Sequence, residues 1–229
     1  MPALPRSLSA PLVAAGTAAF RAASRARGER AIHARGRTLE GRLSVPGGAG
    51  TGAPLLDAPG SYDVLVRVSR SAGLPLPLPD VLGLAVRVLD AHGPGDHQDM
   101  LLDATRPEPL LRRVPWLGRD HLRVLHGSLL PYDVAGNRVL LGARALPGQG
   151  RATLDDLPDV LSYELLVATA RGPWRAWGTV RTSAELPAPL GRQTRFNPWT
   201  TGGGIRPAGP WQTWRREAYD ASHVADDER

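Results

Sequence analysis

The sequence predicts an α+β fold in which an antiparallel β-barrel carries helices packed on its outside. Three observations lead to this prediction. Segments that alternate apolar and polar residues recur between Gly- and Pro-rich turns, which is typical of strands. Helical patterns are confined to the two ends and one central stretch. The chain has 229 residues and no internal repeat, which suits one large domain.

The N-terminal region carries a helical pattern. Ser7 or Ser9 can cap a helix, Pro11 suits its first turn, and Ala-rich sequence continues to Gly28. The same stretch weakly resembles a signal peptide, but its apolar part is interrupted and runs directly into arginines. We therefore expect a helical extension over residues 1–28, a single domain over 29–229 and a cytoplasmic location.

Alternating segments follow in the first half of the domain. Their apolar residues recur at every second position, as in half-buried strands. These segments are 38–45, 63–69, 82–89 and 97–102. The connection 46–60 is rich in Gly and Pro and is expected to be a loop, while the three prolines of 73–80 exclude a central strand there.

The central stretch 107–130 has helical spacing that Pro115 and Gly118 interrupt. Thr105 and Glu108, just at its start, have the spacing of a capping box. We expect one or two short helices here, packed on the barrel.

The last third returns to the strand pattern and ends in a helix. Strands are expected at 137–146, 161–170 and 174–182, with a long polar connection at 147–160. Residues 186–210 are rich in Pro and Gly and should be irregular. A final helix is expected at about 211–226.

Composition excludes several classes of function. The chain has no Cys, so disulfides and thiolate chemistry are ruled out. All 28 basic residues are Arg and the net charge is +6, but the arginines are dispersed and accompany no nucleic-acid motif. No apolar run reaches the roughly 18 residues of a membrane span. No phosphate loop or Gly-x-Ser-x-Gly elbow is present.

The histidines other than His33 show no metal-binding spacing. We expect them on the surface; they are His92, His97, His121, His126 and His223.

Three polar residues share one face of the expected C-terminal helix. Arg215, Tyr219 and Ser222 stand at i, i+4 and i+7 and so share a face. A cation one turn from a tyrosine favours the phenolate, a hard anionic oxygen that can bind ferric iron. Tyr is the haem ligand of catalases.

Upstream segments resemble the haem catalase superfamily, specifically its short mini-catalase branch. The run Arg30-Ala31-Ile32-His33-Ala34-Arg35-Gly36 is similar to the family's distal histidine motif. The segments Val66–Ser71, Asp80–Val86 and Asp99–Asp103 are similar to the strands that follow it, and Phe196-Asn197-Pro198-Trp199 to a Phe-x-Pro-Trp landmark. The resemblance covers about residues 28–226, in family order, and implies a catalase-like barrel of about eight strands.

The resemblance also implies roles for individual residues around a haem b group. His33 is the distal acid and base, and Ser69 accepts the second ring N–H of His33, which fixes the tautomer. Arg30 and Arg67 are partners of the haem propionates. Tyr219 is the axial iron ligand, with Arg215 as its phenolate partner and Ser222 beside it.

The sequence departs from the family at three places. Asp103 stands where the family has a distal asparagine and takes the third catalytic position with a negative charge. Asp226 replaces a second proximal arginine. Only two phenylalanines are present, and Leu84 replaces an aromatic residue expected near the distal side. The C-terminal helical domain of large catalases has no counterpart.

These observations predict a haem-dependent peroxidase or catalase-like enzyme that reduces hydrogen peroxide or organic hydroperoxides, including fatty-acid hydroperoxides. We also expect an organic reductant and self-association of the chain. We expect no binding of nucleic acid. The alternative is a haem-free barrel that binds an apolar ligand or acts as an interaction module.

Overall fold

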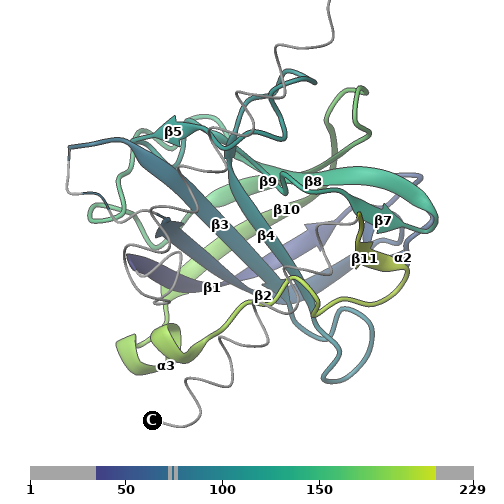
Figure 1. The fold of residues 1–229 in the computed structure, drawn as a ribbon. Helices are drawn as coiled ribbons and strands as arrows, with labels where there is room; N and C mark the ends of the chain where they lie inside the picture. The colour runs from purple at the N-terminus through teal and green to yellow at the C-terminus, as the bar shows by residue number, and fades with distance from the viewer. Residues whose placement is uncertain (1–34, 72–73, 75–76, 210–229) are drawn as a thin grey trace, which may run out of the picture.

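The computed structural model describes residues 35–71, 74 and 77–209, and these form a closed antiparallel barrel (Figure 1). Eight strands close it in the order β8-β6-β4-β3-β2-β1-β10-β9, because β8 pairs with both β6 and β9. The predicted barrel of about eight strands is thus confirmed. The strands are β1 (Arg35–Val45), β2 (Gly60–Arg70), β3 (Asp80–Val88), β4 (Gln98–Thr105), β6 (Leu125–Gly127), β8 (Asn137–Ala145), β9 (Ser162–Ala168) and β10 (Arg175–Glu185).

Smaller elements extend the barrel. The short strands β7 (Tyr132–Val134) and β11 (Ile205–Pro207) continue the sheet from β8, and β5 (Leu117–Gly118) pairs with the start of β3. The described helices are α2 (Pro54–Asp57), within the predicted loop, and α3 (Ala188–Gln193), below β1 in Figure 1. Neither is long and apolar enough to cross a membrane.

The barrel interior is filled by every second residue of each strand. On β2, Val64, Val66 and Val68 are at most 1% exposed and belong to one core that extends through all the long strands. Burial of each such side chain contributes about 1.5–3 kcal/mol. The alternate residues of β1–β4 therefore project from the outer face of the barrel.

The helices predicted within 107–130 do not form. This stretch consists of turns, β5 and β6. Pro107, Pro109 and Pro115 remove backbone donors that a helix needs. The Thr105 hydroxyl, instead of capping a helix, lies within hydrogen-bonding distance of the carbonyl oxygens of Leu111 (3.1 Å) and Val114 (3.0 Å). The predicted helices at 1–28 and 211–226 lie outside the described residues.

Two histidines expected on the surface are instead fully buried inside the barrel. His121 and His126 are 0% exposed, and their rings lie parallel with centroids 6.4 Å apart. Tyr163 of β9 meets His126 edge-on. Desolvation lowers the pKa of His121 to about 3 and that of His126 to about 4, so both rings are neutral at pH 7.

Candidate functional site

A row of small and polar residues crosses the outer face of the first four strands. Strand register places Gly36, Ser69, Gly83 and Asp103 side by side on β1, β2, β3 and β4. They alternate with interior residues such as Val68 and so face outward. Because Gly83 has no side chain, Ser69 and Asp103 flank a gap two strand spacings wide, about 9–10 Å.

Arg67 lies on the same face, one row from Ser69. Its guanidinium donates to the Thr38 hydroxyl at 3.2 Å and to the Gly191 carbonyl oxygen of α3 at 3.3 Å. A Cβ at Gly36 would lie 2.9 Å from this guanidinium, so a glycine here leaves room for it. Partial burial lowers the pKa of Arg67, yet arginine remains charged at neutral pH.

A buried ion pair fastens the Phe-x-Pro-Trp segment to this sheet face. Arg87 of β3 donates to both carboxylate oxygens of Asp99 on β4, at 2.7 and 2.6 Å. Asp99 also accepts from the Asn197 backbone N–H at 2.7 Å, and its own N–H donates to the Thr200 carbonyl oxygen at 2.8 Å. The Arg87 guanidinium stacks 5.2 Å from the Phe196 ring centre. Two distant blocks of the chain thus meet on one face.

The predicted site residues divide into two groups. Arg67, Ser69 and Asp103 are brought together as described. The remaining predicted residues lie outside the described part of the chain; they are Arg30, His33, Arg215, Tyr219 and Ser222. Strand β1 begins at Arg35, two residues after His33.

One expectation about the distal wall is wrong. Leu84 is 1% exposed and belongs to the barrel core, on the opposite side of the sheet from Ser69 and Asp103. It cannot line the face that carries them.

Sequence reasoning missed the Arg87–Asp99 pair. The signal that could have found it is strand register. Arg87 and Asp99 are paired across two neighbouring strands, face outward and carry opposite charges. That signal becomes visible only once the pairing of the two strands is known.

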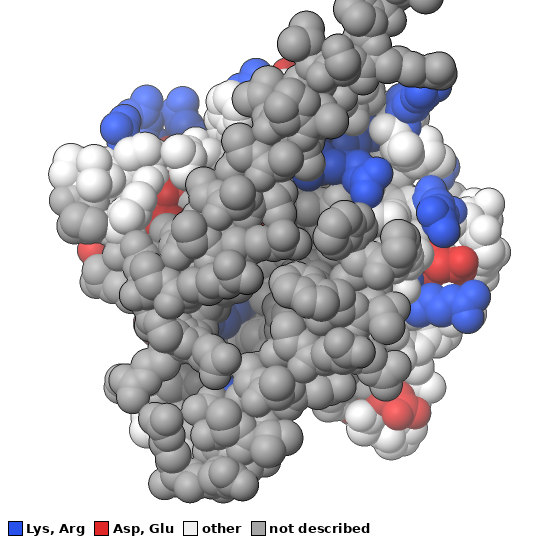
Figure 2. All heavy atoms as spheres, in the orientation of Figure 1, with Lys and Arg blue, Asp and Glu red and all other residues white. Residues whose placement is uncertain are grey.

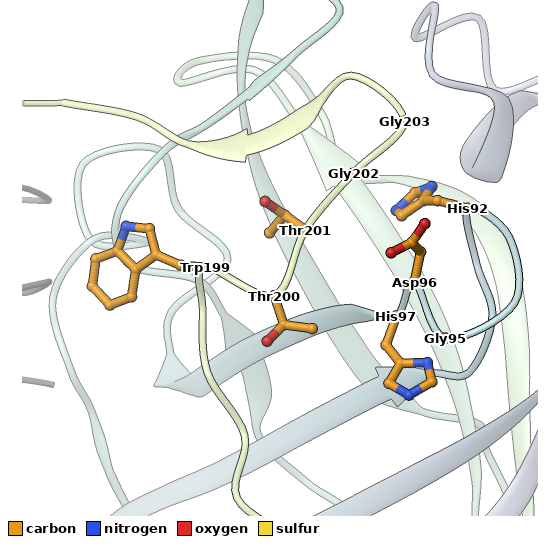
Figure 3. Close-up of a pocket in the computed structure, with 9 residues that line it drawn as sticks. All are labelled: His92, Gly95, Asp96, His97, Trp199, Thr200, Thr201, Gly202 and Gly203. Carbon is orange, nitrogen blue, oxygen red and sulfur yellow. The ribbon is translucent and has the colours of Figure 1, made fainter. Parts of the chain in front are cut away.

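A polar surface pocket of about 410 Å³ lies where the β3–β4 turn meets the segment after Trp199 (Figure 3). Figure 3 shows His92 and Asp96 close together, with Trp199 on the far side. His92 Nε2 lies 3.1 Å from Gln98 Oε1, and a Cβ at Gly203 would lie 2.5 Å from His92 Nδ1. The glycine therefore lets the backbone pass over the imidazole. Of the predicted site residues that the structure describes, Arg67, Ser69 and Asp103, none lines this pocket.

Comparisons with known proteins agree with this architecture. No family model matches the chain, and no curated protein matches it. Among solved structures it resembles a bacterial catalase, with a TM-score of 0.61 and 12% sequence identity, over 96% of this chain and 61% of that chain. The protein therefore has a catalase-like fold. It spans only about three fifths of the catalase chain it matches.

Proposed function

We propose that the protein is a haem-dependent peroxidase or catalase-like enzyme of the mini-catalase type, acting on hydrogen peroxide or organic hydroperoxides. One observation carries the proposal. The catalase-like barrel presents Arg67, Ser69 and Asp103 on one outer face. The family resemblance assigns Arg67 to a haem propionate, and Ser69 and Asp103 to the distal side of haem b.

The described residues fit a flat anionic cofactor. Gly36 and Gly83 have no side chains, so a flat group can approach the sheet beside Ser69. The guanidinium of Arg67 is a permanent cation that could pair with a propionate. No cluster of three or more His, Cys, Asp or Glu side chains in the described part of the chain could hold a metal. The proposal assigns the iron to Tyr219, whose phenolate would hold it.

The chemistry divides between the cofactor and the chain. Bound haem would supply the redox-active iron for a reaction with peroxide. His33 takes the first peroxide proton and returns it to the departing oxygen. In this proposal Ser69 would hold the His33 ring in one tautomer, and Arg30 and Arg67 would bind the propionates. Arg215 would favour the phenolate of Tyr219, with Ser222 beside it.

The haem-free alternative has less support. A small barrel filled by its own side chains leaves no interior volume for an apolar ligand. Trp177, Tyr163 and several leucines fill this interior at under 2% exposure. The pocket at the β3–β4 turn is polar and lies outside the barrel.

Haem uptake by the full chain tests the proposal. Expression with a haem precursor, or titration with hemin, should give a Soret band that Tyr219→Phe abolishes and Tyr62→Phe retains. A colourless protein that takes up no hemin would refute the proposal.

Activity measurements then separate the possible reactions. Oxygen release from hydrogen peroxide identifies catalase turnover, and oxidation of an organic donor identifies a peroxidase. A His33→Ala protein with normal haem content and full peroxide activity would contradict the acid–base role.

A further inference from the structure

Exposed apolar side chains are concentrated in two neighbouring segments of the described chain, residues 110–117 and the residues just before β3, with which β5 pairs. Seven large hydrophobic residues of the described chain are exposed, and five of them lie in these two segments. We call these five the apolar patch; they are Leu78 (48% exposed), Leu110 (89%), Leu111 (39%), Trp116 (45%) and Leu117 (56%).

Hydrogen bonds fix the shape of the patch. The turn that carries Leu110 is tied down by Thr105, whose hydroxyl contacts the carbonyl oxygens of Leu111 and Val114. Leu117 pairs with Val81 at the start of β3, and Arg119 Nε donates to the Pro77 carbonyl oxygen at 2.8 Å, next to Leu78. The patch is thus presented by an anchored segment, with Leu110 projecting at the tip of a turn.

The rim of the apolar patch is cationic. Residues 106–123 contain five arginines and two acidic residues. Glu108 and Asp120 pair with Arg106 (3.3 Å) and Arg123 (3.4 Å). Exposed Arg113 and Arg119 donate to backbone carbonyl oxygens and form no ion pair with another described residue. Figure 2 shows arginine side chains gathered at the upper left, where Figure 1 places β5.

This combination matches the boundary region of an anionic bilayer. Leucines at a turn tip can enter the acyl region, and tryptophan is favoured at the headgroup level. Arginine stems extend alongside the apolar side chains while their guanidinium groups reach lipid phosphates. A bare apolar patch would suit many partners, but two uncompensated cations at its edge favour a negatively charged surface.

We propose that the apolar patch, with Arg113 and Arg119, docks the protein on the surface of an anionic lipid bilayer. The proposal is independent of haem chemistry. Each nearby cation is attracted to an anionic surface, and salt screens this attraction, so the interaction weakens as salt rises.

Vesicle sedimentation with the full chain tests the docking proposal. Wild-type protein should bind phosphatidylcholine vesicles that contain 30% phosphatidylglycerol, and binding should fall at 0.5 M NaCl. Leu110→Asp with Leu111→Asp should reduce partitioning at least tenfold, and so should Arg113→Glu with Arg119→Glu. Val160→Asp and Leu190→Asp, which alter the two exposed apolar residues elsewhere, are matched controls that should bind like wild type.

Several outcomes would overturn the proposal. These are no vesicle binding, equal binding to phosphatidylcholine alone, or unchanged binding by the patch variants. A dimer in solution that Leu110→Asp converts to monomer would assign the patch to a second copy instead. Circular dichroism of each variant excludes loss of fold as the cause.

Discussion

The outer face of β1–β4 and the interior beneath β6 and β9 both hold polar side chains. The two regions differ in whether these side chains have hydrogen-bond partners. On the outer face, Arg87 and Asp99 satisfy each other with two short hydrogen bonds. In the interior, both ring nitrogens of His121, Nδ1 of His126 and the Tyr163 hydroxyl have no hydrogen-bond partner among the described residues. Partnered polar groups fix a surface in place, whereas unpartnered buried groups lower stability by about 1–3 kcal/mol each.

Breaking the Arg87–Asp99 pair should have the largest effect. Asp99→Ala leaves the Arg87 charge without its carboxylate in a mostly buried place, where such a loss costs about 3–5 kcal/mol of unfolding free energy. It also releases the Asn197 N–H from its acceptor. Urea unfolding should show the loss, and hemin uptake should fall with it. Asp63→Ala, which breaks the exposed ion pair between Asp63 and Arg42, is the control. It should change the free energy of unfolding by under about 1 kcal/mol.

Acid should destabilise the protein through the two imidazoles buried in its interior. The folded-state pKa values of His121 and His126, about 3 and 4, lie below the ordinary value of 6.5. The unfolded chain therefore binds more protons between pH 6.5 and 4, and stability is lost as pH falls through this window. Each imidazole adds a slope of up to about 1.4 kcal/mol per pH unit.

Chemical denaturation at several pH values measures this slope. His121→Phe with His126→Phe should flatten the profile between pH 6.5 and 4. An identical slope in the double variant would show that neither imidazole is responsible for the acid sensitivity.

The alternation of apolar and polar residues along the sequence predicts some features of these two regions and not others. The period of two at 63–69 and 82–89 placed β2 and β3 correctly. The same rule would have assigned Leu84 to the core. Family resemblance suggested instead a place near the distal side, and the physical pattern was the better guide.

Other features depended on contacts between distant segments. Residues 107–130 do not form the predicted helices because of their prolines and because of Thr105. Its hydroxyl donates to carbonyl oxygens that a helix would have used as acceptors. Burial of His121 and His126 follows from how β6 and the preceding loop enter the barrel, which no local pattern encodes. The axial and distal residues Tyr219 and His33 remain sequence predictions.

On the outer face, removal of the Arg67 cation should weaken cofactor binding moderately. Arg67→Ala takes away one proposed propionate partner and two hydrogen bonds, to Thr38 and Gly191. We expect roughly a tenfold loss of hemin affinity, about 1.4 kcal/mol. Arg42→Ala, which removes an exposed arginine of β1, is the control. Equal hemin affinity in both variants would contradict the assignment of Arg67.

The smallest expected effect concerns the charge that distinguishes this face from its catalase counterpart. Asp103 faces outward beside Gly83, about 9–10 Å from Ser69 across the sheet. In the proposed site, the side chain of Asp103 would repel the hydroperoxide anion and compete with His33 for the peroxide proton, whereas an amide of the same shape would do neither. Asp103→Asn should therefore raise oxygen release from hydrogen peroxide by about two- to tenfold, or about 0.4–1.4 kcal/mol of barrier, without altering hemin affinity. A fall in oxygen release at unchanged haem content would mean that the carboxylate itself takes part in proton transfer, which makes Asp103 a working acid or base.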